Sequence, residues 1–265
     1  MKVYISADIE GVAGITHWDE ATKTEPEYQE YREQMTREVV AACDGAFAAG
    51  ATEIIVKDAH WTARNLITSE LPRGVKLIRG WSGHPFSMVQ ELDDSFHALI
   101  MVGYHAAAGS DSNPLAHTIT LGVSTIKING VLASEFLLNA YAAALVDVPV
   151  VFVSGDEGLC QEVTALNDEI ETVAVSRGIG DSTISIAPQL AIERIRVEVT
   201  AALERDVSAC KIQLPKQFHA EIRFRDHQKA LRASFYPGVI QIDPHTVAYE
   251  TNDYFELLRM KSFTI

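Results

Sequence analysis

The chain has few cysteines and no long hydrophobic run. Its 265 residues include three cysteines, Cys43, Cys160 and Cys210, which are far apart and form no C-x-x-C pair. This excludes a disulfide framework, and we expect reduced, mostly buried thiols. No apolar segment approaches the ~20 residues that a membrane span requires. Asp8 and Glu10 interrupt what would be the apolar region of a signal peptide. We therefore expect a cytoplasmic protein with no membrane partner.

A surplus of positive charge and a phosphate-binding loop are also missing. The 22 Lys and Arg residues are outnumbered by 36 Asp and Glu residues, which gives a formal net charge of −14. Nucleic acids are bound by basic surfaces, so this balance argues against a nucleic-acid partner. There is neither a G-x-G-x-x-G nor a Walker pattern, and we expect no nucleotide cofactor. The content of 47% hydrophobic and 22% charged residues is typical of a globular protein with a buried core.

Strand-like and helix-like segments alternate over the first two-thirds of the chain. Amphipathic or apolar runs predict helices at 26–50 and 135–147. Short β-branched runs predict strands at 2–8, 52–60, 97–105, 148–158 and 171–180. Residues 123–134 are typical of a hairpin that turns at Asn129-Gly130. This alternation predicts an α/β fold with a mostly parallel sheet flanked by helices on both faces.

The pattern changes after about residue 186. A helix is predicted at 187–206, followed by strands at 219–225 and 238–244 and a final segment at 253–265. This part of the chain is typical of an α+β arrangement. We therefore predict a larger α/β domain at 1–186, which carries the site described next, and a smaller α+β lobe at 187–265.

Carboxylate and imidazole side chains lie at or just after the ends of three predicted strands, and one further carboxylate opens a predicted helix. In chain order these side chains are Asp8, Glu10, Asp58, His60, His105 and Glu135. Ligands of open parallel sheets bind beyond the carboxyl ends of the strands. If the first strand continues to Glu10, Asp8 and Glu10 point to the same face, where at ~4 Å and an effective dielectric constant of ~20 they would repel by roughly 4 kcal/mol. A divalent cation removes that repulsion, so the pattern predicts a metal site.

The number of ligands suits two metal ions. The five ligands are Asp8, Glu10, His60, His105 and Glu135. If one carboxylate bridges, they supply three bonds to each ion, which leaves an open position of the kind found in catalytic sites. Oxygen and nitrogen ligands accept zinc, manganese or cobalt, so the pattern alone does not select the metal.

Several polar residues have two interpretations. Asp58 either orients His60 or stabilises the turn after its strand. Asp156 and Glu157 either receive the ammonium group of a substrate or cap the next helix, and capping is favoured. The remaining histidines lie in loop-like stretches or lack a strand-end context, and we leave them outside the site: His17, His84, His97, His219, His227 and His245.

Five sequence blocks, in order, match a known family. They are SADIEG at 6–11, KDAHW at 57–61, GYHAAAG at 103–109, AHT at 116–118 and ASEFLLNA at 133–140. The first fits the S-x-D-x-E-G signature of the zinc D-aminopeptidases, the DppA-type metallopeptidases, and the chain resembles that family over most of residues 1–160. The resemblance implies an α/β sheet domain with a smaller lobe, and a ring-stacked homodecamer with a central channel.

The resemblance also implies the ligands and the reaction. The residues that it assigns to two zinc ions per chain are Asp8, Glu10, His60, His105 and Glu135. Asp8 is the implied bridge, and His117 is an additional catalytic residue. We expect a dizinc aminopeptidase that cleaves short peptides with a free N-terminus, D-alanyl peptides of the D-Ala-D-Ala type being preferred. A metal-bridging hydroxide attacks with the help of His117, which serves as acid, base or nucleophile.

Other functions are compatible with the same ligands. A dinuclear phosphoesterase uses similar side chains but needs basic groups near the phosphate, and only Lys57 and Arg64 are nearby in the sequence. Another amidohydrolase, including an aminopeptidase for L-peptides, would share the mechanism. A non-catalytic peptide-binding protein would use the metals structurally.

Overall fold

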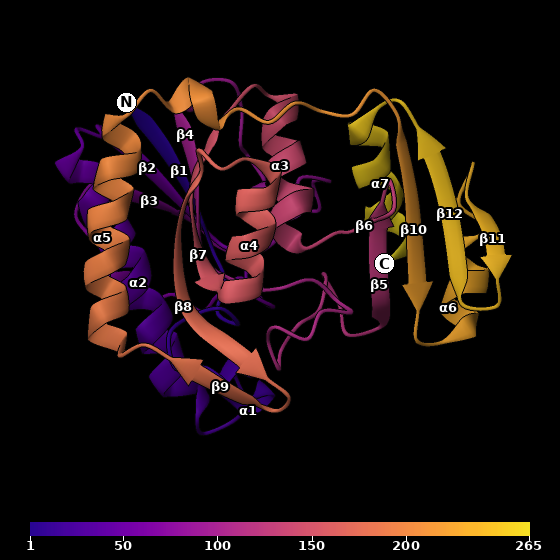
Figure 1. The fold of residues 1–265 in the computed structure, drawn as a ribbon, viewed down its shortest axis with the longest axis horizontal. Helices are drawn as coiled ribbons and strands as arrows, with labels where there is room; N and C mark the ends of the chain where they lie inside the picture. Colours follow the sequence, from indigo (N-terminus) through magenta and orange to yellow (C-terminus); the bar gives the residue numbers. More distant parts are fainter.

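Two β-sheets organise the chain, and the computed structural model describes residues 1–265 (Figure 1). The larger sheet has the order β3-β2-β1-β4-β7-β8-β9, and its strands are parallel except for β9, which pairs antiparallel with β8. Its strands are β1 (Lys2–Ala7), β2 (Glu53–Asp58), β3 (Val75–Ile78), β4 (Ala98–Tyr104), β7 (Val150–Asp156), β8 (Glu171–Ile179) and β9 (Ser182–Ser185). The predicted strands of the first 180 residues that belong to this sheet are thus all present.

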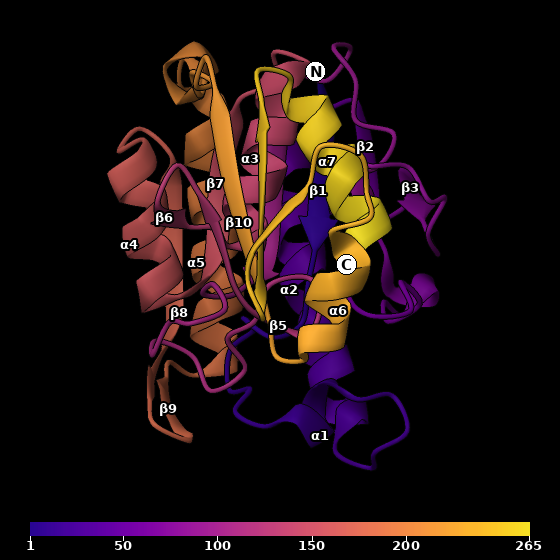
Figure 2. The ribbon, with the colours of Figure 1, turned by 90° about the vertical axis from the view of Figure 1, so that its right-hand side faces the viewer.

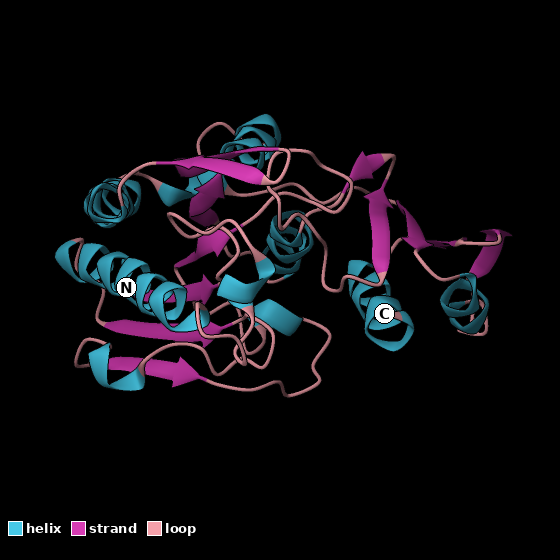
Figure 3. Ribbon diagram, turned by 90° about the horizontal axis from the view of Figure 1, so that it is seen from below, coloured by secondary structure: helices cyan, strands magenta, loops and turns pink.

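Helices cover both faces of the larger sheet, as predicted for buried parallel strands. Helices α2 (Tyr28–Ala48) and α5 (Pro188–Glu204) pack against each other on one face, and α3 (Glu135–Leu145) and α4 (Glu157–Leu166) lie on the other (Figures 1 and 3). Strands β4 and β7 are buried along their whole length. The α/β prediction is therefore confirmed. The short elements are α1 (Trp18–Ala21) and the 3₁₀ helices η1 (Thr68–Glu70), η2 (Ser87–Val89) and η3 (Val207–Cys210).

The smaller sheet is antiparallel and has the order β11-β12-β10-β5-β6. Its strands are β5 (Val123–Ile128), β6 (Val131–Leu132), β10 (Phe218–Phe224), β11 (Ile240–Asp243) and β12 (Thr246–Thr251). The β5–β6 hairpin turns at Asn129 and Gly130, with φ of 52° and 84°, as that dipeptide predicts. Helices α6 (His227–Ala233) and α7 (Tyr254–Thr264) pack on this sheet (Figure 2).

Helix α7 connects the smaller sheet to the helices that cover the larger sheet. It lies between α3 and the smaller sheet, and the Tyr254 hydroxyl donates a hydrogen bond to the Leu138 carbonyl at 2.9 Å (Figure 1). Helix α5, which follows residue 186, packs on the larger sheet, whereas β5 and β6, which precede it, pair in the smaller one. The division into a domain at 1–186 and a lobe at 187–265 stays a prediction. It concerns which parts of the chain fold together, and strand pairing does not test that.

The strand order reverses between β1 and β4, and this sets the position of the site. From β1 the chain proceeds to β2 and β3 on one side and then crosses to β4 on the other. At such a point the loops after the two strands diverge and leave a crevice at their carboxyl ends.

The cysteines agree with the expectation of buried, reduced thiols. Cys43, Cys160 and Cys210 are buried and unpaired. None of the helices combines the length and the apolar character that a membrane crossing requires.

Candidate active site

Asp8 and Glu10 lie in the turn that follows β1. The strand ends at Ala7 and does not continue to Glu10, so strand alternation does not place the two carboxylates. The turn places them instead, because the Gly11 N–H donates to the Gly103 carbonyl at 2.9 Å and holds the chain against β4. Both side chains still enter the same space, and each residue is only 2% exposed.

Three histidines each have one ring nitrogen fixed on a backbone carbonyl. The pairs are His60 Nε2 with Ala21 O at 2.8 Å, His105 Nδ1 with Ala106 O at 3.0 Å, and His117 Nδ1 with Leu115 O at 3.0 Å. A carbonyl only accepts, so each of these nitrogens carries a proton and the other nitrogen presents its lone pair in the neutral ring. Backbone contacts of this kind orient metal-binding histidines in proteins.

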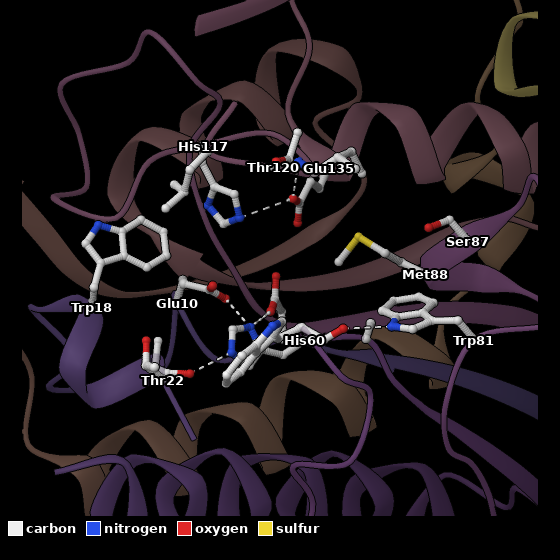
Figure 4. A pocket seen from close by; sticks show the side chains of 16 residues that line it. Glu10, Trp18, Thr22, His60, Trp81, Ser87, Met88, His117, Thr120 and Glu135 are labelled. Atoms are coloured by element: carbon white, nitrogen blue, oxygen red, sulfur yellow. Dashed lines mark hydrogen bonds and ion pairs between the residues drawn. The ribbon is translucent and has the colours of Figure 1, made fainter. Parts of the chain in front are cut away.

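The opposite nitrogens of His60 and His105 face carboxylates, and Figure 4 shows His60 against Glu10. His60 Nδ1 lies 3.0 Å from Glu10 Oε2 and 3.4 Å from Asp8 Oδ1. His105 Nε2 lies 3.4 Å from Glu135 Oε2 and 3.6 Å from Asp8 Oδ2. The two oxygens of Asp8 therefore face two different histidines. The five predicted ligands form two groups that share this one carboxylate.

These side chains fit divalent metal ions. Glu10 Oε2 and His105 Nε2 are buried atoms without a hydrogen-bond partner. Lone pairs that face one another in a dry interior are costly unless a proton or a cation lies between them. The donors are carboxylate oxygens and imidazole nitrogens, the set that zinc accepts. Two groups of three are close enough to share an ion: Asp8, Glu10 and His105, and His105, His117 and Glu135.

The electrostatics of the side chains alone point the same way. Burial raises the pKa of Asp8 well above its usual range, and repulsion from Glu10 raises it further. Burial also opposes the ionisation of Glu135, but His105 and His117 hold its pKa down at about 2. Despite burial, Glu10 raises the pKa of His60 and Glu135 raises the pKa of His105. Without a metal these buried groups are therefore balanced by protons, whose place a bound cation would take.

His117 stands at the edge of this cluster. It lies on a loop before β5, with Nε2 3.7 Å from Glu135 Oε1 and its ring edge-to-face with Trp18 at 5.2 Å between centroids. Burial and the neighbouring His105 lower the pKa of His117. It also lines the cavity in front of the carboxylates (Figure 4). A neutral imidazole at this position can accept a proton from a group in the cavity.

Asp58 serves the turn rather than the ring of His60. Its carboxylate accepts hydrogen bonds from the backbone N–H groups of Asn65 and Leu66 and from the Asn65 amide. The acceptor that orients His60 is instead the Ala21 carbonyl at the end of α1. Of the two interpretations of Asp58, the structure supports turn stabilisation.

Asp156 and Glu157 lie away from the cavity. Asp156 is the N-cap of α4 and accepts from the Leu159 N–H at 2.9 Å, and its other oxygen accepts from the Ala106 N–H at 2.7 Å. Glu157 is half-exposed beside Arg177. Neither residue lines the cavity. The structure therefore supports the capping interpretation and places neither residue in the wall of the cavity.

A cavity of about 570 Å³ opens onto the cluster. It is lined by all three tryptophans of the chain, Trp18, Trp61 and Trp81, which the sequence analysis did not single out. A signal was present, because Trp61 directly follows His60 in the KDAHW block. None of the six histidines that we left outside the site lines this cavity.

Comparisons with known proteins agree on one family. A family model described as D-aminopeptidase matches residues 1–263. A D-aminopeptidase of Bacillus subtilis (strain 168) is 33% identical over 258 residues, which is 97% of this chain and 93% of that protein. The solved structure of the Zn-dependent D-aminopeptidase DppA from Bacillus subtilis, described as a self-compartmentalizing protease, superposes with a TM-score of 0.90. It is 30% identical, and the match covers 100% of this chain and 98% of that one.

Proposed function

Since the chain belongs to the D-aminopeptidase family, we propose that it is a dizinc aminopeptidase that removes the N-terminal residue from short peptides. D-alanyl peptides of the D-Ala-D-Ala type are its preferred substrates. The observation that carries this proposal is the position of Asp8, whose two oxygens face His60 and His105 separately.

The five side chains divide into two sets of ligands. Asp8, Glu10 and His60 would hold one zinc ion, and Asp8, His105 and Glu135 would hold the other. Three protein ligands to each ion leave a position for substrate or water. The backbone carbonyls of Ala21 and Ala106 fix the rings of His60 and His105, so the opposite ring nitrogens stay directed at the carboxylates.

When bound, the zinc ions supply Lewis-acid polarisation of the scissile carbonyl and lower the pKa of water. The rest of the chemistry belongs to the chain itself. His117 Nδ1 stays on the Leu115 carbonyl, so Nε2 is the atom that exchanges a proton with the nucleophile or the leaving amine. Burial keeps this ring neutral and therefore ready to accept a proton.

The cavity also suits a substrate with a free amino group. Apart from its histidines, the ionisable side chains that line it are the carboxylates of Asp8, Glu10 and Glu135, and no lysine or arginine is among the lining residues. A phosphate ester would lack the basic partners that it needs there. The Lys57 ammonium is held by the Asp58 and Gly80 carbonyls. Peptide hydrolysis is thus favoured over phosphoester hydrolysis.

The proposal includes assembly in the cytoplasm as a homodecamer. Supporting it, the surface around the smaller sheet exposes large apolar side chains, including Phe235, Ile240 and Phe263. Exposed apolar patches of this kind are typical of protein–protein contacts. Native mass spectrometry of the purified protein checks this part, and a monomer as the only species would contradict it.

The test of the function is the release of free D-alanine from D-Ala-D-Ala, with L-Ala-L-Ala in parallel. The protein is stripped of metal and reloaded with zinc, and the Glu10→Ala variant is assayed alongside. Cleavage of the D-dipeptide that requires both zinc and Glu10 is the expected result. Zinc-dependent cleavage of the L-dipeptide alone would keep the mechanism and reject the D-preference. Turnover of an aryl phosphate without peptide cleavage would contradict the proposal.

A further inference from the structure

Two tryptophans at the mouth of the cavity are unusually exposed. Trp61 is 51% exposed and Trp81 is 42% exposed, and both line the cavity together with Met88. A tryptophan buries a large apolar area when a ligand covers it, and binding sites are lined mainly by such apolar and aromatic side chains. We call Trp61 and Trp81 the tryptophan wall.

The wall is held in one arrangement by polar contacts beneath it. The Trp81 indole N–H donates to the Trp61 carbonyl at 2.7 Å, and the Gly80 N–H donates to the Ala63 carbonyl at 2.9 Å. The Lys57 ammonium donates to the Gly80 carbonyl at 2.7 Å and lies 3.9 Å from the centroid of the Trp81 ring. Lys57 is completely buried, and its ammonium is held between the Asp58 and Gly80 carbonyls and the face of the indole.

The backbone around the cavity is strained. Trp61, Ser87 and Ile119 have positive φ values of 43°, 49° and 66°, and all three residues line the cavity. The left-handed region is unfavourable for residues other than glycine, and strain of this kind concentrates at ligand-binding sites. For Trp61 this conformation presents a large apolar side chain to solvent, which does not stabilise the folded chain by itself.

The position of the wall indicates which part of a peptide it meets. If the amino end of a substrate binds beside the carboxylates, as the proposed function requires, the rest of the peptide extends toward the mouth. Figure 4 shows Trp81 and Met88 on one side of the histidine–carboxylate cluster and Trp18 on the other. Trp18 packs against His117 and is less exposed than the wall. On that premise, the more exposed wall meets the part of the peptide that follows the scissile bond.

We propose that the tryptophan wall is the subsite for an apolar side chain on the residue that follows the scissile bond, with Lys57 as its positioning residue. This inference rests on the proposed aminopeptidase function and adds the substrate class, D-alanyl peptides whose second residue is apolar and larger than glycine. Lys57 acts only through Trp81 and the Gly80 carbonyl and touches no substrate.

The kinetic test compares D-alanyl-D-leucinamide with D-alanyl-glycinamide. In the wild type the leucine side chain raises kcat/KM by roughly 10-fold or more, mainly through KM. Trp81→Ala brings this ratio close to 1, whereas Trp81→Phe keeps a ring over Lys57 and retains most of the preference. Lys57→Met also lowers the ratio, because Trp81 loses its anchor. Should Lys57→Met fail to fold, the two Trp81 variants still decide the question.

A matched control removes an exposed apolar side chain elsewhere. Ile184 on β9 is 59% exposed and lies outside the cavity, so Ile184→Ala leaves the leucinamide-to-glycinamide ratio unchanged. If Trp81→Ala slows both amides equally, or leaves the preference for leucine intact, the subsite is overturned.

A binding measurement separates failure of the subsite from failure of the proposed function. All three tryptophans line the cavity, so intrinsic fluorescence reports its occupancy. Zinc-loaded His117→Ala protein is titrated with both amides. A Kd for D-alanyl-D-leucinamide at least 10-fold lower than for the glycinamide supports the subsite even if no peptide is cleaved. Equal Kd values overturn it, whether or not the enzyme is a peptidase.

Discussion

His105 and His117 lie with their rings stacked, the centroids 4.4 Å apart and the planes inclined by 8°. Each ring donates Nδ1 to a nearby carbonyl and turns Nε2 toward Glu135. The two residues differ in burial, because His105 is fully enclosed and His117 forms part of the cavity wall. This pairing places the proposed metal ligand His105 beside the proposed proton-transfer group His117, and the two roles are separable by experiment.

Replacing His117 with alanine should lower kcat by ~10²–10⁴-fold, the usual contribution of general acid–base catalysis. The zinc content should stay unchanged, because both sets of ligands remain. Turnover of D-Ala-D-Ala and the zinc content per chain are measured on the same preparation.

The control for this variant is His84→Ala, which removes a histidine that lies outside the cavity. It should change neither turnover nor zinc content. Loss of zinc from the His117→Ala protein would show that His117 is a metal ligand, a role that its place in a cluster with His105 and Glu135 permits.

Gly11→Ala should disrupt the metal centre. A Cβ at Gly11 would lie 1.7 Å from the Tyr104 carbonyl oxygen, so the turn that carries Asp8 and Glu10 must move away from β4. We expect reduced zinc binding and a loss of about 1–3 kcal/mol of stability, as in overpacked cores. Gly50→Ala is the control, since a Cβ there meets nothing within 4 Å and only the positive φ is strained. Normal zinc content in Gly11→Ala would contradict this account.

Asp156→Ala should destabilise the fold without removing zinc. The loss of the α4 cap costs roughly 0.5–2 kcal/mol, and the buried Ala106 N–H left without its acceptor adds roughly 1–3 kcal/mol. Urea unfolding measures the change, and zinc analysis of the folded variant accompanies it. Glu157→Ala, at the next position, should change stability by less than about 0.5 kcal/mol. A folded Asp156→Ala protein without zinc would refute the structural role.

Glu38 should give stability a dependence on pH. Its carboxyl group is fully buried, accepts from the Ala13 N–H and the Gln34 amide, and has its pKa raised by burial from 4.5 to about 7. Between these values the folded state binds more protons than the unfolded state, so stability falls as pH rises from 4.5 to 7 and is level outside that window. The total change is about 3 kcal/mol.

The Glu38→Gln variant isolates this contribution. Urea unfolding gives the free energy of unfolding of wild type and variant at pH 4.5 and pH 8. A chelator is present throughout, so that zinc does not contribute. The wild type should lose about 3 kcal/mol more than the variant across this range. Parallel changes in the two proteins would show that Glu38 titrates normally in the fold.

Much of the site was predictable because parallel strands bring distant parts of the sequence to one edge. His60 and His105 follow β2 and β4, the two neighbours of β1, so strand order alone brings them to Asp8. Glu135 was predictable for a local reason, since Ser134 caps α3 and fixes where the helix begins.

Other features of the site and fold depend on contacts that leave no recognisable pattern in a single sequence. The Ala21 carbonyl that fixes His60 comes from a helix of four residues, too short for a periodic signal. The pairing of β5 with β10 joins residues 92 to 101 positions apart, and antiparallel pairing at that distance leaves no local pattern. The position of Trp81 beside Trp61 depends on a buried Lys57, which the sequence pattern would place at a surface.

The most direct test of the dizinc account is a titration of the metal-free protein with zinc, following bound zinc and D-alanine release together. We expect each chain to bind two zinc ions and full activity to appear only with the second. We also expect Glu10→Gln to bind fewer than two and to stay inactive at the same zinc concentration. Full activity with one zinc ion per chain would contradict the shared role of Asp8 between His60 and His105.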